Sequence, residues 1–368
     1  MTSAPAVTLV GTAWEVETRR DDGAFDALAG EWRDLYARCP AATPFQSAGW
    51  LAGWWRSKGR PGALRLVLVR HRGRLVAAAP LYRVRRWGLP VLVPVGGGQS
   101  DFTDVLMDPV HADRSLGVLA GALRAERGAV ALDLPEVRPG AVAHLLAARW
   151  PGRVWTAPGS TCLQVPARPI AELLGTLPGR TAGKARAKLR KVDASGVVVT
   201  SVDAAGAAEA VGRLLDLHVR QWRGRGLNPE HARDGFRRHL ASAVPDMIAH
   251  GDAALFEYRV DGAVVASDLA LIGHDTVGAY LYGADPALRD RLDVTLMLLR
   301  QDLALAASRG VRHFSMLRGT EPYKAKWRPT AEVSSRLILG SSPLAPAYAT
   351  PAHHRATIAA ATRSHRRP

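Results

Sequence analysis

Residues 254–273 read ALFEYRVDGAVVASDLALIG, and this stretch decides the fold of the second half of the chain. It contains two apolar runs rich in strand-forming residues, separated by the Asp-Gly pair at 261–262. Asp-Gly is favoured in the two-residue turns of β-hairpins because both turn positions need a positive φ angle. The stretch therefore predicts an antiparallel hairpin. The following TVGAYLYGAD, at 276–285, predicts a third strand.

Helices are expected on both sides of these strands. The segment at 292–310 (LDVTLMLLRQDLALAASRG) has the apolar spacing of a long amphipathic helix that closes with a glycine, and a strand should follow at 311–319. Before the hairpin, helices are expected at 207–226 and 232–251. The second should be broken or kinked at Pro245, because proline cannot donate to the helical ladder.

The first half of the chain predicts the same order of elements. These are a helix at 24–38, a helix capped by Ser47, a hairpin at 64–84, a glycine loop running into a strand at 96–109, a helix at about 111–127 and a strand at 129–137. We therefore expect an α/β protein with mixed sheets (α+β in the broader sense), built from two tandem copies of one plan. The expected parts are a first domain at 1–160, a linker and basic helical segment at 161–195, a second domain at 196–342 and a disordered tail at 343–368.

The composition is that of a globular protein. Of the 368 residues, 47% are hydrophobic and 22% are charged, and the length suits two domains. No apolar run approaches the ~18 residues of a membrane span, and the N-terminus lacks the pattern of a secretory signal, so we expect a cytoplasmic protein. Cys39 and Cys162 are expected to be reduced thiols, and no Cys/His cluster has the spacing of a structural metal site.

The formal net charge is +16, which favours an anionic partner such as nucleic acid, an acidic membrane surface or a phosphorylated ligand. The alternative is an arginine-rich composition spread over the whole chain. Lysine is scarce, because it supplies only six of the 49 cationic residues. Lys184, Lys188 and Lys191 lie at i, i+4 and i+7, so they would share one helix face and are the candidates for contacting an anionic partner. The alternative is a solvated helix face.

Five segments, taken in order, resemble a known family. They are TPFQSAGWLAGWW (43–55), APL (79–81), GGGQSDFTDVLMDP (96–109), LHVRQWRGRG (217–226) and FSMLRGTEPYKAKW (314–327). Together they resemble the CelD/BioF-type acetyltransferases of the GNAT superfamily, which are similar in turn to the Fem aminoacyl-tRNA-dependent ligases. The resemblance implies two tandem GNAT-like domains with the chemistry in the second.

In that fold the strands at 276–283 and 312–317 splay apart, and the pantetheine arm of an acyl-CoA pairs with the exposed backbone of the first. The helix that starts near Asp293 points its N-terminus at the pyrophosphate, where free amides favour negative charge. The cofactor-binding residues that this implies are Tyr280, Leu281, Gly283, Arg289, Arg291 and Thr295.

The sequence departs from the family pattern before this helix. Typical members have an Arg/Gln-x-x-Gly-x-Gly/Ala loop there, whereas residues 285–295 read DPALRDRLDVT. Asp290 and Asp293 would repel a pyrophosphate, although Arg289 and Arg291 could supply cations. The departure leaves room for an acyl carrier other than CoA.

Acyl transfer to an amine needs a base, stabilisation of the oxyanion and a proton for the leaving group. Asp268 interrupts an apolar strand, where burial should raise its pKa toward neutrality and suit it to act as the base. The alternative is an outward-facing or structural carboxylate. Glu321, near the expected channel mouth, is the second candidate, and its alternative is a carboxylate that stabilises a helix start.

Three further residues are candidates for the reaction. Lys324 lies in YKAKW, which resembles the Phe-Lys segment of Fem ligases, where the lysine helps the charged acyl intermediate; the alternative is a solvated lysine. Tyr323 and Tyr282 are candidates for protonating the leaving group, and the alternative is packing.

Other polar residues are candidates for substrate binding. His218 and Trp222 would share a helix face at i and i+4, with a capped or partly buried histidine as the alternative. The substrate-binding candidates are Asp101, Asp104, His218, Arg220, Trp222 and Arg318. The GGG segment lacks the lysine and Ser/Thr of a P-loop, which excludes nucleotide hydrolysis.

Three functions follow from these observations. The first is an N-acyltransferase that moves an acyl group, acetyl above all, from acyl-CoA to an amine of a small molecule, amino sugar or peptide, with acyl-CoA as cosubstrate and no tightly bound cofactor. The second is a Fem-like transferase that uses aminoacyl-tRNA as donor. The third is a degenerate GNAT scaffold that binds without catalysis.

Overall fold

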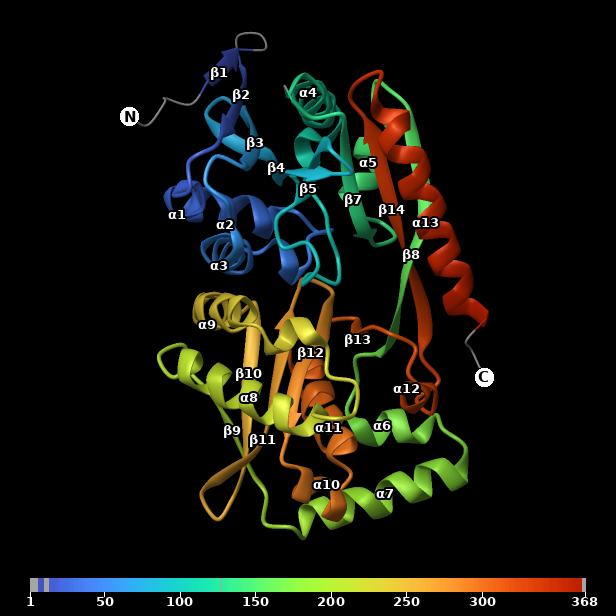
Figure 1. Cartoon of the computed structure of the whole chain (residues 1–368). Coiled ribbons are helices and arrows are strands. Elements are labelled where there is room, and N and C mark those ends of the chain that lie inside the picture. The colour runs from blue at the N-terminus through green and yellow to red at the C-terminus, as the bar shows by residue number, and fades with distance from the viewer. Residues whose placement is uncertain (1–5, 10–12, 127, 366–368) are drawn as a thin grey trace. The chain divides into compact units, whose positions relative to one another are not determined.

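The computed structural model describes residues 6–9, 13–126 and 128–365 (Figure 1). The chain divides into two compact units. Unit 1 comprises residues 1–161 and 332–368, and unit 2 comprises residues 162–331. Unit 2 is therefore one continuous segment, whereas unit 1 takes residues from both ends of the chain.

Unit 1 is built on a mixed sheet with helices packed on it. The strands, in sheet order, are β1 (Ala6–Leu9), β2 (Trp14–Arg19), β3 (Leu64–His71), β4 (Arg74–Arg86), β5 (Leu89–Pro94), β7 (Ala131–Val137), β14 (Thr330–Gly340) and β8 (Val154–Pro166), with β6 (Leu106–Met107) paired to β4. The helices are α1 (Ala24–Ala27), α2 (Ala29–Arg38), α3 (Ala48–Lys58), α4 (Ala112–Ala125), α5 (Val142–Ala148) and α13 (Ala345–His365). β5 and β7 run parallel.

Unit 2 repeats this plan. Its strands, in sheet order, are the end of β8, then β13 (His313–Arg318), β12 (Thr276–Ala284), β11 (Ala263–Ile272), β10 (Ala253–Val260) and β9 (Val198–Ser201). Its helices are α6 (Ile170–Gly175), α7 (Gly179–Asp193), α8 (Ala207–Trp222), α9 (Asp234–Ala249), α10 (Pro286–Arg291), α11 (Val294–Ser308) and α12 (Pro322–Ala325). The predicted mixed α/β class is confirmed.

The hairpin predicted from residues 254–273 is formed by β10 and β11. Asp261 and Gly262 take φ angles of 48° and 81°, as a two-residue hairpin turn requires. Of the two predicted effects of Pro245, a break is wrong, because α9 continues through the proline, and a kink stays a prediction. The neighbouring Val244 and Met247 are fully buried, and this packing outweighs the one hydrogen bond that proline removes.

A shared irregularity supports the view that the two units are copies of one plan. β7 and β13 each contain a β-bulge, opposite β14 and β8 respectively. In each bulge the next-to-last strand residue has a left-handed backbone, with φ of 54° at Glu136 and 53° at Leu317. Residues other than glycine seldom adopt this conformation, so its presence at matching positions supports the tandem repeat predicted from the order of elements.

The motif at 43–55 has a structural role in unit 1. Ser47 caps α3 by accepting a hydrogen bond from the Trp50 amide, as predicted. The Trp50 indole donates to Ser100 Oγ at 2.9 Å, and a Cβ on Gly96 would lie 3.2 Å from the indole nitrogen. The glycine loop therefore packs against α3, and its glycine at 96, with φ of 90°, serves this close approach.

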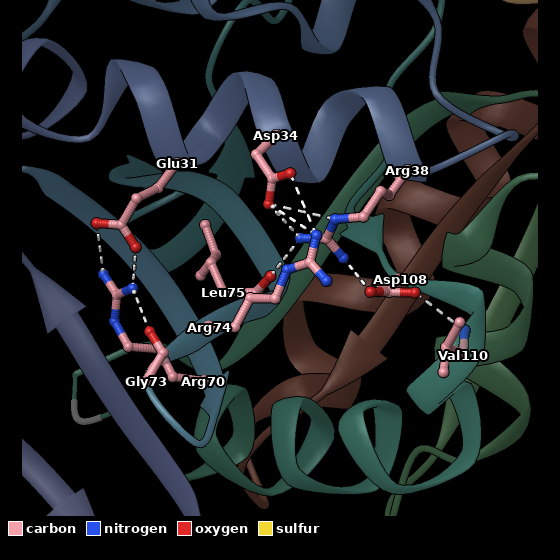
Figure 2. A network of polar contacts seen from close by, with 9 residues as sticks. All are labelled: Glu31, Asp34, Arg38, Arg70, Gly73, Arg74, Leu75, Asp108 and Val110. Atoms are coloured by element: carbon pink, nitrogen blue, oxygen red, sulfur yellow. Dashed lines mark hydrogen bonds and ion pairs between the residues drawn. The ribbon is translucent and has the colours of Figure 1, made fainter.

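An ion-pair network fixes α2 to the β3–β4 hairpin (Figure 2). Arg38 lies at its centre and binds Asp34 at 2.8 Å, the Leu75 carbonyl at 2.8 Å, and the buried Asp108. Asp108 in turn accepts from the Val110 amide at 3.0 Å. A second pair, between Glu31 and Arg70, lies farther toward the start of α2. The network joins segments that are separate in the sequence.

The expectation of a disordered tail at 343–368 is wrong, because residues 345–365 form α13. Tyr348 is fully buried on this helix and donates its hydroxyl to Asp133 of β7. Asp133 is also fully buried, and it binds Arg86 at 2.7 Å and Arg336 at 2.7 Å. These contacts hold α13 on unit 1, and the sequence gives no periodic signal of them. Residues 366–368 lie outside the described part of the chain.

No helix among the described residues combines the length and the apolar character that a membrane span needs. The segment at 161–195, predicted to be a linker with a basic helix, contains the end of β8, α6 and α7, and the cations of α7 are exposed.

Candidate functional site

Two neighbouring strands of unit 2 part from one another. β12 and β13 run parallel and pair only at their first three residues, from Thr276 opposite His313 to Gly278 opposite Ser315. β12 then continues to Ala284 paired with β11 alone, while β13 continues paired with β8. From Ala279 onward one edge of β12 is therefore not paired with another strand.

A β-bulge lies directly beyond the point where the strands part. Leu281 pairs with Leu269 and Ala279 pairs with Ala270, so Tyr280 is the extra residue on β12. Bulges re-aim side chains and interrupt the regular ladder, and they are frequent next to active sites. The structure thus places Tyr280, a predicted cofactor-binding residue, at the vertex of the parted strands.

Leu317 forms the apolar wedge at this vertex. A Cβ on Gly278 would lie 3.0 Å from Leu317 Cδ2, so the leucine side chain packs over the last paired residue of β12. The left-handed φ of Leu317 directs its side chain there, and the residue is 5% exposed. Sequence analysis missed Leu317, because an apolar residue in a strand gives no signal of its backbone conformation.

Lys324 holds the end of β13 by binding its backbone. Its ammonium donates to the carbonyls of Met316 at 3.0 Å, Arg318 at 3.1 Å and Gly319 at 3.3 Å, and it pairs with Glu321 at 2.8 Å. The residue is 3% exposed, so the alternative of a solvated lysine is wrong. All three donors of the ammonium are engaged, which fits a positioning residue better than one that contacts an acyl intermediate.

Tyr323, Tyr282 and Glu321 lie close to one another, and Glu321 pairs with Lys324. Burial raises the pKa of the Tyr323 hydroxyl, and the nearby Glu321 and Tyr282 raise it further. Tyr323 therefore stays a neutral proton donor over the physiological range. Tyr323 is nevertheless 44% exposed and Glu321 is exposed, so both can meet a substrate. Arg318 ends β13 next to them and is half-buried.

Asp268 lies in the core of unit 2, where it forms a hydrogen-bonded carboxyl pair with Asp302 of α11. Both residues are 2% exposed, and burial raises the pKa of Asp268 to about 7. Asp268 Oδ2, Asp302 Oδ1 and the Tyr258 hydroxyl are buried without a hydrogen-bond partner among the described residues. An amine would have to enter this core to reach Asp268. Sequence analysis missed Asp302, although an acid within an apolar helix face was a usable signal.

This carboxyl pair predicts an unusual pH dependence of stability. The unfolded chain loses these protons near pH 4, whereas the folded chain keeps them to higher pH. Between about pH 4 and about 7 the unfolded state therefore binds fewer protons, and the free energy of unfolding falls as pH rises. Asp302→Asn should flatten this slope and raise the free energy of unfolding at pH 8 by roughly 1–3 kcal/mol.

Urea unfolding at pH 5 and pH 8 measures this effect. Asp261→Asn is the matched control, because Asp261 is exposed in a hairpin turn that asparagine also suits, and it should leave the slope unchanged. The same slope in Asp302→Asn as in the natural chain would contradict the carboxyl pair.

Two side chains of α8 bind the open edge of β12. The His218 imidazole lies 2.7 Å from the Tyr282 carbonyl oxygen through Nδ1, and the Ala284 amide donates to Gln221 Oε1 at 2.7 Å. Gly283 lies between them, and a Cβ there would collide with the α8 backbone at His218 and Leu214. Gly283 therefore serves the contact with α8. Sequence analysis missed Gln221, which lies one turn after His218.

His218 belongs to a chain of hydrogen bonds whose direction is fixed. A carbonyl only accepts, so Nδ1 of His218 carries the hydrogen, and its Nε2 accepts from His231 Nδ1 at 3.1 Å. His231 Nε2 then accepts from the Asn228 side chain at 3.2 Å. Burial lowers the pKa of His218, and burial with His218 nearby lowers that of His231 to about 4. Both rings are therefore neutral near pH 7.

The remaining candidates near α8 lie around its C-terminal end. The Trp222 and Tyr282 rings are 6.5 Å apart, and the Arg289 guanidinium lies 6.0 Å from the Trp222 ring. Arg220 is 3.8 Å from Asp285. The structure thus brings four of the predicted residues together, whereas Leu281 is buried in the strand and Arg291 is exposed at the end of α10.

The N-terminus of α11 carries its own carboxylate. Asp293 Oδ1 accepts from the Leu296 amide at 3.0 Å, and Oδ2 accepts from Lys188 of α7 at 2.7 Å. Against the effect of burial, Lys188 and this amide hold the pKa of Asp293 below its ordinary value. Thr295 follows in the first turn and is half-buried. A pyrophosphate at this helix end would have to displace Asp293, so the residues present do not fit it as they stand.

α7 contributes the predicted basic face. Lys184 and Lys191 are exposed on it, whereas Lys188 is engaged with Asp293. The three lysines thus do not share one role. Lys188 ties α7 to the start of α11, and the other two face solvent.

In unit 1, Asp104 is not a substrate contact. It is 4% exposed, and its carboxylate accepts from the amides of Val105 at 2.8 Å, Val142 at 2.9 Å and Ala143 at 2.7 Å. Burial raises its pKa to about 7, while the three amides act in the opposite direction. Asp104 therefore fixes the start of α5. Asp101 is 8% exposed within unit 1.

Comparisons with known proteins agree with this fold. The model of the acetyltransferase (GNAT) domain matches residues 179–325. The structure of FemX is similar at 13% identity and a TM-score of 0.63, over 86% of this chain and 97% of FemX. L-PGS from Bacillus licheniformis matches at 11% identity and 0.54, over 89% and 96% of the two chains.

A third similar structure is the C-terminal domain of a putative lysylphosphatidylglycerol synthetase from Agrobacterium fabrum, at 11% identity and a TM-score of 0.53, over 88% of this chain and 95% of that one. A search of curated proteins found no match. At these identities the structural likenesses concern the fold alone.

Proposed function

Because residues 179–325 form a GNAT-type acetyltransferase domain, we propose that this chain is an N-acyltransferase that moves an acyl group from an acyl-CoA thioester to an amine. The acceptor is an amine of a small molecule, an amino sugar or a peptide. The observation that carries the proposal is the parting of β12 from β13 after Gly278, with a bulge at Tyr280 beside the vertex.

The parted strands suit a donor that enters between them. β12 offers an edge with backbone donors and acceptors, and the Leu317 wedge keeps β13 from closing on it. An extended thioester arm can lie along this edge with its acyl end at the bulge. The fit is partial, since Asp293 already occupies the start of α11, and His218 and Gln221 already bind two backbone groups of the β12 edge.

Glu321 and Tyr323 are the residues we assign to proton transfer. The amine nitrogen attacks the thioester carbon, and its proton passes to the exposed Glu321 carboxylate, directly or through one water. As the C–S bond breaks, the leaving thiolate takes the proton of the Tyr323 hydroxyl, which burial and the nearby Glu321 keep protonated. Asp268 is left out of this step, because it is paired with Asp302 in the core.

Tyr323→Phe tests this assignment. The phenylalanine keeps the ring and removes the proton, so kcat should fall about 100-fold, with little change in the affinity for acetyl-CoA. Calorimetric titration with acetyl-CoA and longer acyl-CoAs, followed by thiol-release kinetics with an amine panel, measures both quantities. Absence of binding to every acyl-CoA would reject the donor, and full activity of Tyr323→Phe and Glu321→Gln would favour a scaffold without catalysis at these residues.

A second candidate donor is an aminoacyl-tRNA. Two observations favour it. Asp293 occupies the pyrophosphate position at the start of α11. Lys184 and Lys191 are exposed on α7, close in sequence to Lys188, which binds Asp293. This candidate predicts tRNA binding that weakens steeply with salt. Replacing the three lysines by Glu should abolish that binding, and an unchanged affinity would reject the role of α7.

A further inference from the structure

The open edge of β12 is already hydrogen-bonded to the chain's own side chains. The Asp285 amide donates to the Val265 carbonyl of β11, so by strand alternation the Ala284 amide and the Tyr282 carbonyl face the opposite edge. That is the edge from which β13 has parted. Gln221 accepts from the first of these groups and His218 donates to the second, each at 2.7 Å.

These two groups are a donor and an acceptor on one side of a strand. They are the type of pair that an amide-bearing arm, such as pantetheine, would use to add itself to the sheet. The side-chain amide of Gln221 and the imidazole of His218 satisfy them instead. His218 is 7% exposed and Gln221 is 1% exposed, so neither is loosely placed.

The placement of both side chains is fixed by the packing of α8. Gly283 lets the helix backbone approach β12 so closely that a Cβ would collide with it. His218 is further fixed by the bond to His231, and the Gln221 Nε2 atom is buried without a hydrogen-bond partner among the described residues. Burying the Gln221 Nε2 group without a hydrogen-bond partner costs free energy. We take this cost as a sign that the hydrogen bond accepted by Gln221 Oε1 from the Ala284 amide has a function.

We infer that His218 and Gln221 are specificity-determining residues that compete with the donor's arm for the β12 edge. They lower the affinity for donors that carry an amide arm, relative to a donor whose acyl group reaches the bulge at Tyr280 without pairing along β12. This inference rests on the proposed function in one respect, namely that the donor enters between β12 and β13.

The experiment measures the affinity for acetyl-CoA, for pantetheine and for adenosine 3′,5′-bisphosphate, the nucleotide half of CoA without the arm. The variants are Gln221→Ala, His218→Ala and the double variant. Removing the two competing hydrogen bonds should raise the affinity for acetyl-CoA and for pantetheine about 10-fold and leave the affinity for the bisphosphate unchanged. In kinetics, the KM for acetyl-CoA should fall with little change in kcat. Asp216→Ala is the matched control, because Asp216 is exposed on α8 and pairs with Arg237 of α9. This variant keeps both bonds to β12 and should not change the affinity for pantetheine.

Hydrogen exchange at the Ala284 amide gives a readout that does not depend on turnover. In the free natural chain this amide should exchange slowly, and in Gln221→Ala it should exchange fast until pantetheine is added. Gln221→Ala alone decides the matter if the double variant fails to fold. Unchanged affinity for pantetheine in the folded variants, including no binding at all, overturns the inference.

The two proposals fail in different ways. If the variants bind pantetheine more tightly but no variant transfers an acyl group, the inference stands and the proposed reaction is rejected. If acetyl-CoA is turned over with the same KM in all variants, the reaction stands and the competition is rejected.

Discussion

Replacing Asp133 by asparagine should lower the free energy of unfolding by about 3–5 kcal/mol. Asp133 is fully buried in unit 1, and its carboxylate accepts from Arg86, Arg336 and Tyr348. Asparagine removes the negative charge that pairs with the two guanidinium groups. Its NH₂ group is a donor and would face the N–H and O–H donors of Arg86, Arg336 and Tyr348. The half-buried Arg336 and the more exposed Arg86 would both lose their carboxylate partner, and the buried hydroxyl of Tyr348 would lose its acceptor.

Urea unfolding followed by tryptophan fluorescence measures the loss. Tyr348→Phe is the matched control, since it removes one hydrogen bond from the same carboxylate and should cost only about 1 kcal/mol. Hydrogen exchange should show α13 losing protection first in both variants, more strongly in Asp133→Asn. A change below 1 kcal/mol in Asp133→Asn would show that the network does not hold α13.

The second large effect concerns activity. Lys324→Met should lower kcat/KM for acyl transfer at least 100-fold, because the three carbonyls at the end of β13 lose their common donor. Glu321 then loses its partner as well, and the left-handed turn around Leu317 is no longer fixed. A displacement of about 1 Å of positioning groups is enough for a loss of this size.

Lys326→Met is the control for this prediction. Lys326 lies two residues away and its ammonium is 4.8 Å from the Trp327 ring, without a contact to the β13 carbonyls among the described residues. It should keep activity within about threefold of the natural chain. Faster hydrogen exchange at residues 316–320 in Lys324→Met would separate a positioning role from direct catalysis, and full activity of that variant would contradict both roles.

Local chemistry made part of the fold predictable. The Asp-Gly turn, the cap at Ser47 and the closing glycine of α11 follow from short-range rules, and each is present. α13 was mispredicted because its stability comes from Tyr348 bonding to Asp133, 215 residues away, which leaves no periodic pattern. A break at Pro245 was mispredicted because burial of the neighbouring Val244 and Met247 outweighs one missing hydrogen bond.

The candidate site was predictable only where a family pattern covered it. The parting of β12 and β13 came from the resemblance and is confirmed by the register. The engagement of Lys324 with carbonyls, the capture of Asp104 by three amides and the edge contacts of Gln221 depend on long-range packing. The sequence shows which hydrogen-bonding groups a residue has. Only the folded structure shows whether neighbouring residues already bind those groups.

The division of the chain has a consequence for biosynthesis. Unit 1 needs β14 and α13, which follow all of unit 2 in the sequence. The ribosome synthesises the chain from its N-terminus, so unit 2 can complete its core before Arg336 and Tyr348 are available to bind Asp133. The part that is synthesised first is thus the last to complete its fold, and until then β7 lacks its partner strand β14.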